Sequence, residues 1–74
     1  MAQHTFRLDG DFIELNVLLK LLGLAPSGGA AKAMIATGAV RVDGNVETRK
    51  ACKLRIGQLV DLANEEIVIV GPDG

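Results

Sequence analysis

The first part of the chain has the hydrophobic period of a helix. Apolar side chains recur every three or four positions between residues 11 and 22, as on one face of an amphipathic helix. Asp11 followed by Glu14 is typical of a capping box, and Gly23 is typical of the position just beyond a helix end. The pattern therefore predicts a first helix over residues 11–22, with a wide buried face that includes Leu21.

A short turn, LAPS, separates this helix from a second one, predicted over the segment GGAAKAMIATG. Ser27 is a favoured N-cap residue, and Gly38 ends the segment as a C-terminal cap. Ala31, Met34 and Ile35 form an apolar stripe at helical spacing. The two segments together predict a helix–turn–helix unit.

Beyond Gly38 the hydrophobic period shortens to two, as in a β-strand. Val40 and Val42 are expected to face the core while the residues between them face solvent. Asp43-Gly44 follows directly and is a strong signal for a hairpin turn. We therefore expect a β-hairpin after the second helix.

The remaining strands are predicted from similar short apolar runs. In the run CKLRIG, Cys52, Leu54 and Ile56 are expected to point inward, which leaves Lys53 and Arg55 in solvent. The other predicted strands cover residues 5–8, 59–62 and 67–70. The order of one short N-terminal strand, two helices and a small, mainly antiparallel sheet predicts a single α+β domain over residues 1–74, with a core of about 5–70.

The charge of the chain is strongly polarised along the sequence. Its net charge is only −1 over 74 residues. Residues 41–55 carry five basic and two acidic side chains, a charge of +3, whereas the rest carries three basic and seven acidic, a charge of −4. Grouped like charges repel one another unless an anionic partner compensates them. The sequence therefore leaves two interpretations open, a solvated strand face or a surface that binds an anion.

A phosphate backbone is a frequent partner for a basic cluster of this kind. The chain has no Trp or Tyr, and Phe6 and Phe12 are both expected in the core, so base stacking is hardly available. Recognition would then rest on phosphate and ribose contacts to folded or double-helical RNA. Ser27 and the amides of Gly28 and Gly29 offer a second anion site at a helix N-terminus; the alternative is a tight turn that needs small residues.

The segment PSGGAAKAMIATGAVRVDGNVET resembles the αL motif of the ribosomal protein S-four-type RNA-binding domain. That family pattern runs Ser, Arg, two variable positions, Ala, a basic residue, two variable positions, Ile, then Gly-x-Val-x-Val-(Asn/Asp)-Gly. The residues in register are Ser27, Ala31, Lys32, Ile35, Gly38, Val40, Val42, Asp43 and Gly44. LRIGQLVDL resembles the later hydrophobic-x-x-Gly-Asp/Gln-x-hydrophobic close of the family, and ETRKACKLRIGQ is similar to its small stand-alone bacterial members of YbcJ type.

The resemblance implies an RNA-facing surface made by the second helix and the following hairpin, with Ser27, Lys32 and Arg41 as contacts. Gly28 and Ala33 occupy positions where the family commonly has basic residues. We therefore expect binding to depend more on the later basic residues, so that Arg49→Glu with Lys50→Glu weakens RNA binding far more than Lys32→Ala. The predicted RNA contacts are Ser27, Gly28, Lys32, Arg41, Arg49, Lys50, Lys53 and Arg55.

The sequence gives little support for an enzyme. His4 is the only His and is expected in a frayed terminus, and no catalytic pair with Ser or Cys can be assembled around it. Glu65 and Glu66 are adjacent and would point to opposite faces of a strand. Cys52 is the only Cys, which excludes an internal disulfide and argues against a zinc site; a small buried hydrophobe is expected. We predict no catalytic residue, no metal site and no cofactor.

The preferred interpretation is a monomeric cytoplasmic protein that binds structured RNA, with ribosomal and transfer RNA both compatible. No apolar stretch approaches the roughly 18 residues of a membrane span, and the N-terminus lacks the apolar region of a signal peptide. The alternative is a protein-interaction adaptor that uses the same basic face on an acidic partner. A carrier of the ubiquitin-like type is disfavoured, because the chain ends in GPDG rather than in Gly-Gly.

Overall fold

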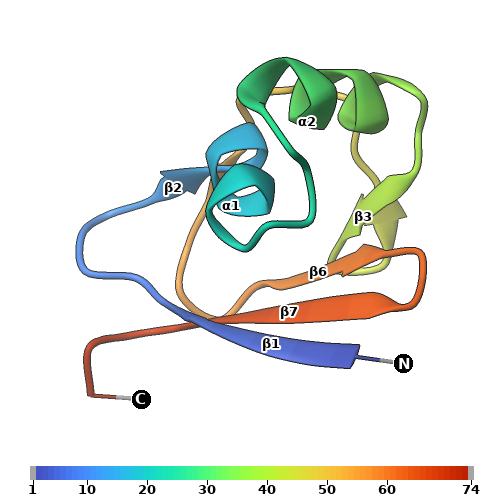
Figure 1. Ribbon diagram of the computed structural model, residues 1–74. Coiled ribbons are helices and arrows are strands. Elements are labelled where there is room, and N and C mark those ends of the chain that lie inside the picture. Colours follow the sequence, from blue (N-terminus) through green and yellow to red (C-terminus); the bar gives the residue numbers. More distant parts are fainter. Residues whose placement is uncertain (1, 74) are drawn as a thin grey trace.

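Two helices lie on one face of a five-stranded sheet (Figure 1). The computed structural model describes residues 2–73. The strands follow one another across the sheet in the order β1-β7-β6-β3-β4, and all neighbours are antiparallel except β1 and β7, which are parallel. Their bounds are β1 Ala2–Arg7, β3 Val40–Val42, β4 Asn45–Val46, β6 Leu59–Leu62 and β7 Glu65–Val70. The predicted α+β class, with two helices packed on a small, mainly antiparallel sheet, is confirmed.

A second, two-stranded sheet links the helical layer to the basic part of the chain. Its strands are β2 (Ile13–Glu14) and β5 (Lys53–Leu54), which pair antiparallel. The helix α1 (Leu15–Leu21) follows β2 directly, and α2 (Gly28–Ala36) follows after the turn. None of the helices over residues 2–73 has the length and apolar character that a membrane crossing requires.

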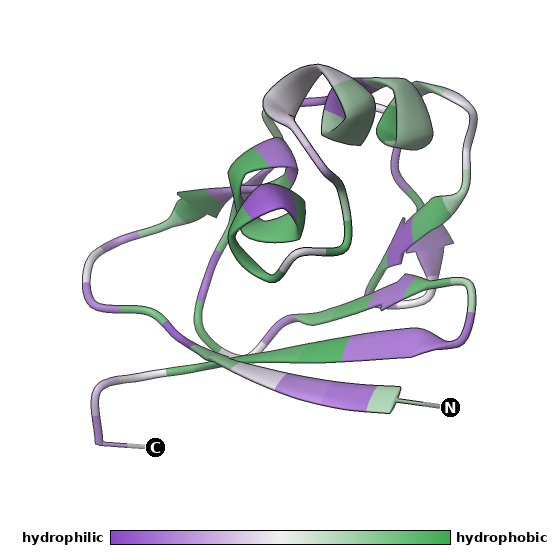
Figure 2. Cartoon of the chain, viewed as in Figure 1, coloured by the Kyte–Doolittle hydropathy of each residue, from purple (hydrophilic) through white to green (hydrophobic). Residues whose placement is uncertain are grey.

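The core fills the space between the helices and the five-stranded sheet. α1, α2 and the inward positions of β3, β6 and β7 each supply residues that solvent hardly reaches. In Figure 2, β7 is hydrophilic where it begins and hydrophobic along the rest of its length. The fully enclosed large side chains are Leu15, Leu18, Leu19, Ile35, Val40, Leu54, Val60, Ile67 and Ile69. The alternation predicted for the hairpin is confirmed, because Val40 and Val42 are buried on either side of an exposed residue.

The start of α1 differs from the prediction. Asp11 and Glu14 do not form a capping box: Ile13 and Glu14 pair with β5, and the helix begins only at Leu15. Its first amides are bound by the backbone instead, since Leu15 N donates to the carbonyl of Cys52 at 2.9 Å and Asn16 N donates to that of Lys50 at 3.1 Å. The buried face of α1 is narrow, since Leu15, Leu18 and Leu19 are its buried residues. The expectation of a buried Leu21 is wrong, because that residue lies off this face and is 61% exposed.

The predicted ends of α2 and the hairpin are confirmed. The Ser27 hydroxyl accepts a hydrogen bond from the amide of Ala30 at 3.1 Å, as an N-cap residue does. Gly38 has a φ of +82°, which suits the position after the helix end. Asp43 and Gly44 have φ values of +52° and +85° and connect β3 to β4 in a two-residue turn, the geometry that favours Asp-Gly.

Three other expectations are corrected near the chain ends and after β5. Ile56 is 52% exposed rather than inward, because β5 ends at Leu54 and the chain turns between Arg55 and Gln58. Phe12 is 40% exposed rather than buried, since the inward position of β2 belongs to its neighbour Ile13. His4 lies within β1, not in a frayed end, and its Nε2 is 3.2 Å from the Glu65 carboxylate.

Candidate nucleic-acid interface

The residues expected to contact RNA are at the surface but do not form one continuous patch. Seven of them are exposed and Gly28 is half-buried. They fall into four groups, which are the beginning of α2, the loop that leads into β5, the outer face of the two-stranded sheet, and β3. Each group has a different electrostatic environment.

At the beginning of α2, the backbone is open to solvent. A Cβ atom added at Gly28 would meet nothing within 4 Å, and one added at Gly29 would meet only the Ser27 hydroxyl at 3.9 Å. Neither position therefore requires glycine for packing, which removes the alternative of a turn too tight for larger residues. Lys32 is exposed on the next turn of this helix. The exposed amides and the lysine are the parts of α2 available to a phosphate.

In the loop before β5, Glu47 holds Arg49. The Glu47 carboxylate accepts hydrogen bonds from the Arg49 amide at 2.9 Å, from Nε at 2.9 Å and from Nη2 at 3.0 Å. These bonds lower the pKa of Glu47 from its ordinary 4.5 to about 2, and the carboxylate raises the pKa of Arg49. Although the Arg49 side chain is 79% exposed, its guanidinium already has an anionic partner two residues away, which offsets its charge.

Lys50 presents the free positive charge of this loop. Its side chain is exposed and makes no salt bridge with any residue in the described range 2–73. Its position is fixed by the backbone, because its carbonyl accepts from Asn16 N of α1. Beside it, Arg49, Ala51, Cys52 and Lys53 line a shallow depression. The half-buried side chain of Cys52 packs against the core. Burial raises the pKa of its thiol, and the Glu47 carboxylate raises it further, so the thiol stays protonated.

The outer face of the two-stranded sheet combines two cations with an aromatic ring. Glu14 lies opposite Lys53 on this face, while Ile13 and Leu54 turn to the core. The Lys53 ammonium lies 4.9 Å from the centre of the Phe12 ring, within the range of a cation–π contact. The Arg55 guanidinium donates from Nη1 to the backbone carbonyl of Asp11 at 3.3 Å. The sequence analysis expected Phe12 in the core and so missed it as a surface residue. Once Ile13 is placed in the core, the alternation of side chains along a strand indicates that its neighbour Phe12 faces solvent.

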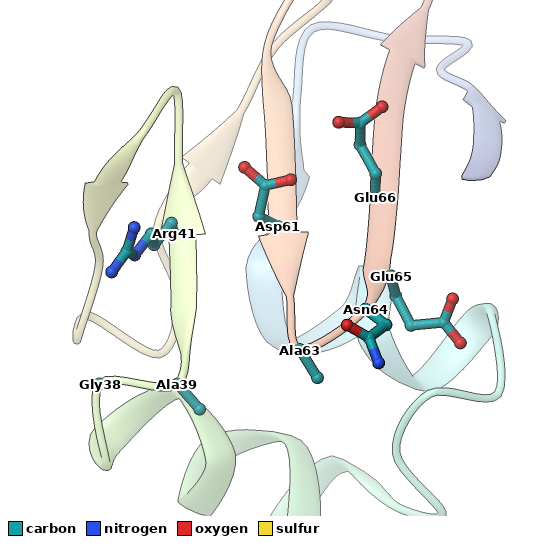
Figure 3. Close-up of a pocket in the computed structure, with 8 residues that line it drawn as sticks. All are labelled: Gly38, Ala39, Arg41, Asp61, Ala63, Asn64, Glu65 and Glu66. Carbon is teal, nitrogen blue, oxygen red and sulfur yellow. The ribbon is translucent and has the colours of Figure 1, made fainter. Parts of the chain in front are cut away.

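Arg41 lies apart from the other cations, on the sheet face opposite the helices. It is directly across from Asp61, which is across from Glu66 on the next strand. Figure 3 shows these side chains around a depression that Gly38, Ala39, Ala63, Asn64 and Glu65 also line. With three carboxylates among its lining residues, this depression is the acidic side of the sheet, and it attracts phosphate less than the other three groups do.

The fold and its sequence match a known family. The family model described as the S4 domain matches residues 6–70 of the chain. The chain belongs to the S4 domain family. This S4 domain is 52% identical over 58 residues to YbcJ of Escherichia coli (strain K12) and equally to YbcJ of Shigella flexneri, a match that covers 78% of this chain and 83% of each relative.

A solved structure supports the same assignment for the helical part of this S4 domain. The solution structure of E. coli YbcJ, described as revealing an αL motif involved in RNA binding, matches with a TM-score of 0.70 and 49% identity. The match covers 89% of this chain and 85% of the other. The pair α1–α2 with the hairpin β3–β4 is thus the αL motif of this S4 domain. The groups around α2, Lys50 and β5 are its candidate RNA-contacting surfaces.

Proposed function

We propose that this S4 domain binds structured RNA, such as ribosomal or transfer RNA, through phosphate and ribose contacts and without catalysing a reaction. The observation that carries the proposal is the αL motif, shared in sequence and fold with a protein whose motif is described as involved in RNA binding. The exposed cations of α2, the loop at residues 49–50 and β5 support it. They lie on elements fixed by the core rather than on free chain ends.

The charged side chains would both bind the RNA phosphates and orient the protein on the RNA. Lys32, Lys50, Lys53 and Arg55 would each neutralise a phosphate. The residues outside 41–55, which include Lys32, carry a net −4, and their excess of carboxylates would repel RNA from the rest of the surface. About three to five neutralised phosphates give a modest, salt-sensitive affinity, with a log-log salt slope near −0.9 per phosphate on B-DNA. Arg49 contributes less than expected from the sequence, because Glu47 offsets its charge. Arg41 contributes less because it lines the same depression as three carboxylates.

The contribution of Lys50 can be tested by charge reversal. Lys50→Glu changes the local charge by two units and breaks no side-chain contact that holds the fold. At about 1 kcal/mol per unit charge at contact distance in water, the affinity for a short structured RNA should fall roughly 5- to 30-fold. Fluorescence anisotropy with a labelled transfer RNA at several salt concentrations measures this loss. The double change with Arg49→Glu is less informative, since it also breaks the contacts of Arg49 with Glu47.

Arg7→Glu is the matched control, because Arg7 is exposed on β1, an edge strand that carries none of the predicted contact residues. It changes the net charge equally and should alter the affinity less than twofold. Equal losses from the two variants would show that only net charge matters and would refute a located binding surface. Chemical-shift mapping with the same RNA and with heparin adds a second criterion. An identical response to both polyanions would also contradict RNA recognition.

A further inference from the structure

An aromatic ring at the surface is unusual in this chain and has no role in the core. The protein has two Phe residues and no Trp or Tyr. Phe6 packs against the core, whereas Phe12 is among the exposed large hydrophobic residues. An exposed aromatic ring has a face on which a nucleobase can stack. The surrounding side chains decide whether this ring is placed for such a contact.

The register of the two-stranded sheet places Phe12 among basic side chains. Ile13 pairs with Leu54 and Glu14 with Lys53, so continuing the ladder by one residue sets Phe12 opposite Arg55. Side chains on a strand alternate between faces, which leaves Phe12, Glu14, Lys53 and Arg55 on the outer face. The contact of Lys53 with the ring and the bond from Arg55 to the carbonyl of Asp11 agree with this placement. The Lys53 ammonium thus lies over the ring, and the Arg55 guanidinium is bonded to the backbone carbonyl of the residue next to it.

We propose that Phe12 stacks on an unpaired RNA base while Lys53 and Arg55 bind the phosphates on either side of that nucleotide. The proposal rests on the RNA binding proposed above and adds to it a contact with a base. The ligand class is RNA with a bulge, loop or single-stranded end, since bases within a helix are not accessible for stacking on a side chain. Fully paired RNA would bind through the cations alone.

Lys53 covers the ring only loosely in the free protein. A cation–π contact at an exposed site is weak, whereas a phosphate offers the ammonium a full opposite charge. When Lys53 turns to a phosphate, it uncovers the ring face that the base then occupies. The carboxylates of Asp11 and Glu14 lie on the same segment as the ring and repel phosphate there. An uncharged base is therefore the part of the nucleotide that fits over Phe12.

The test compares two hairpin RNAs that differ only in one bulged adenosine. Stacking of a base on an aromatic side chain is lost in Phe12→Ala, and its known range of about 1–3 kcal/mol corresponds to a 5- to 150-fold weaker affinity for the bulged hairpin. The affinity for the fully paired hairpin should change less than twofold. Phe12→Leu keeps an apolar side chain but no ring, so it should behave like Phe12→Ala. Phe12→Trp should retain the affinity for the bulged hairpin.

Leu21→Ala is the matched control, because it removes an exposed apolar side chain from another element; it should leave both affinities unchanged. In Phe12→Trp the new side chain is the only Trp in the protein, and its fluorescence should be quenched by the bulged hairpin and not by the paired one. Equal losses on both hairpins in Phe12→Ala, or no loss on either, would overturn the stacking role and leave RNA binding intact. Failure of the unmodified protein to bind either hairpin would overturn the proposed function and the stacking role together.

Discussion

Replacing Glu47 by Gln should weaken the fold and strengthen RNA binding at the same time. The carboxylate of Glu47 is the anionic partner that holds the guanidinium and the amide of Arg49. Gln can still accept a hydrogen bond but carries no charge, so the ionic part of these contacts is lost. The same change releases a positive charge within the loop that also presents Lys50. A loss of stability together with a gain in RNA affinity would show that Glu47 both stabilises the fold and offsets the charge of Arg49.

The size of the stability effect follows from the pKa of Glu47. Its fall from 4.5 to about 2 corresponds to about 3 kcal/mol if solvent did not screen the pair. The Glu47 side chain is 15% exposed, but that of Arg49 is 79% exposed, and exposed ion pairs contribute at most about 1 kcal/mol. We therefore expect a loss of about 1 kcal/mol at pH 7. Domains of this size have only about 3–5 kcal/mol in total, so the loss is measurable.

The pH dependence gives the prediction its sign. A carboxylate whose pKa is lowered in the folded state stabilises the protein above its unfolded pKa. That contribution is lost as the pH falls through the folded value. The difference between Glu47→Gln and the unmodified protein should therefore be constant above pH 5.5, shrink as the pH falls below 4.5, and be absent at pH 2.

Urea unfolding followed by far-ultraviolet circular dichroism at pH 7, 4 and 2 measures this difference. Asp9→Asn is the control, since it removes one negative charge from an exposed residue and should leave the stability nearly unchanged. In the RNA assay, Glu47→Gln should bind about two- to fivefold more tightly, and Asp9→Asn less so. An equal stability difference at pH 2 and pH 7 would refute the ionic explanation. Unchanged stability at every pH would show that the ionic part of the Glu47–Arg49 contact contributes nothing.

Two further substitutions test the fold. Leu54→Ala changes a fully buried position of β5. It should lower the free energy of unfolding by about 2–5 kcal/mol and move the urea midpoint to a clearly lower concentration. If the shift were no larger than that of Leu21→Ala, an exposed-site change, the role of β5 in the core would be contradicted. Ser27→Ala removes the hydroxyl that accepts a hydrogen bond from the amide of Ala30 and should lower the free energy of unfolding by about 0.5–2 kcal/mol. Ser27→Asp supplies another acceptor and should restore this stability. If it did not, the N-cap hydrogen bond would not be what stabilises α2.

The sequence determined those features of the fold whose physical causes are local. The Ser27 cap, the glycines after the helices and the Asp43-Gly44 turn each depend on a few neighbouring residues. The family pattern also depends on such local spacing, which is why it identified the αL motif. The start of α1 could not be predicted in this way. Its first amides bind carbonyls at Lys50 and Cys52, more than thirty residues along the chain, and Ile13 fits the hydrophobic period of a helix and of a strand equally.

The candidate site shows the same division. That the cations after the hairpin would be exposed followed from alternation, and the structure places Lys53 and Arg55 outside as expected. Whether these cations share one surface could not be predicted from the sequence. It depends on the sheet face on which each side chain lies and on the strands that pair beside it. Arg41 lies across from Asp61 of β6, which lies across from Glu66 of β7. Phe12 is exposed because its neighbour Ile13 takes the inward position of β2. These outcomes require the pairing of distant strands, which charge counts along the sequence do not contain.

The parallel pairing of β1 with β7 also constrains the order in which parts of the fold can form. Gln3 and Glu66 are bonded across 63 residues, and β1 has no other strand neighbour in the sheet. The contacts of the αL motif are much closer in sequence and close faster, since short loops form before long ones. The αL motif can therefore form before β1 pairs with β7. The pairing of β1 therefore completes the sheet late, since its register joins Ala2 to Glu65 and Arg7 to Val70.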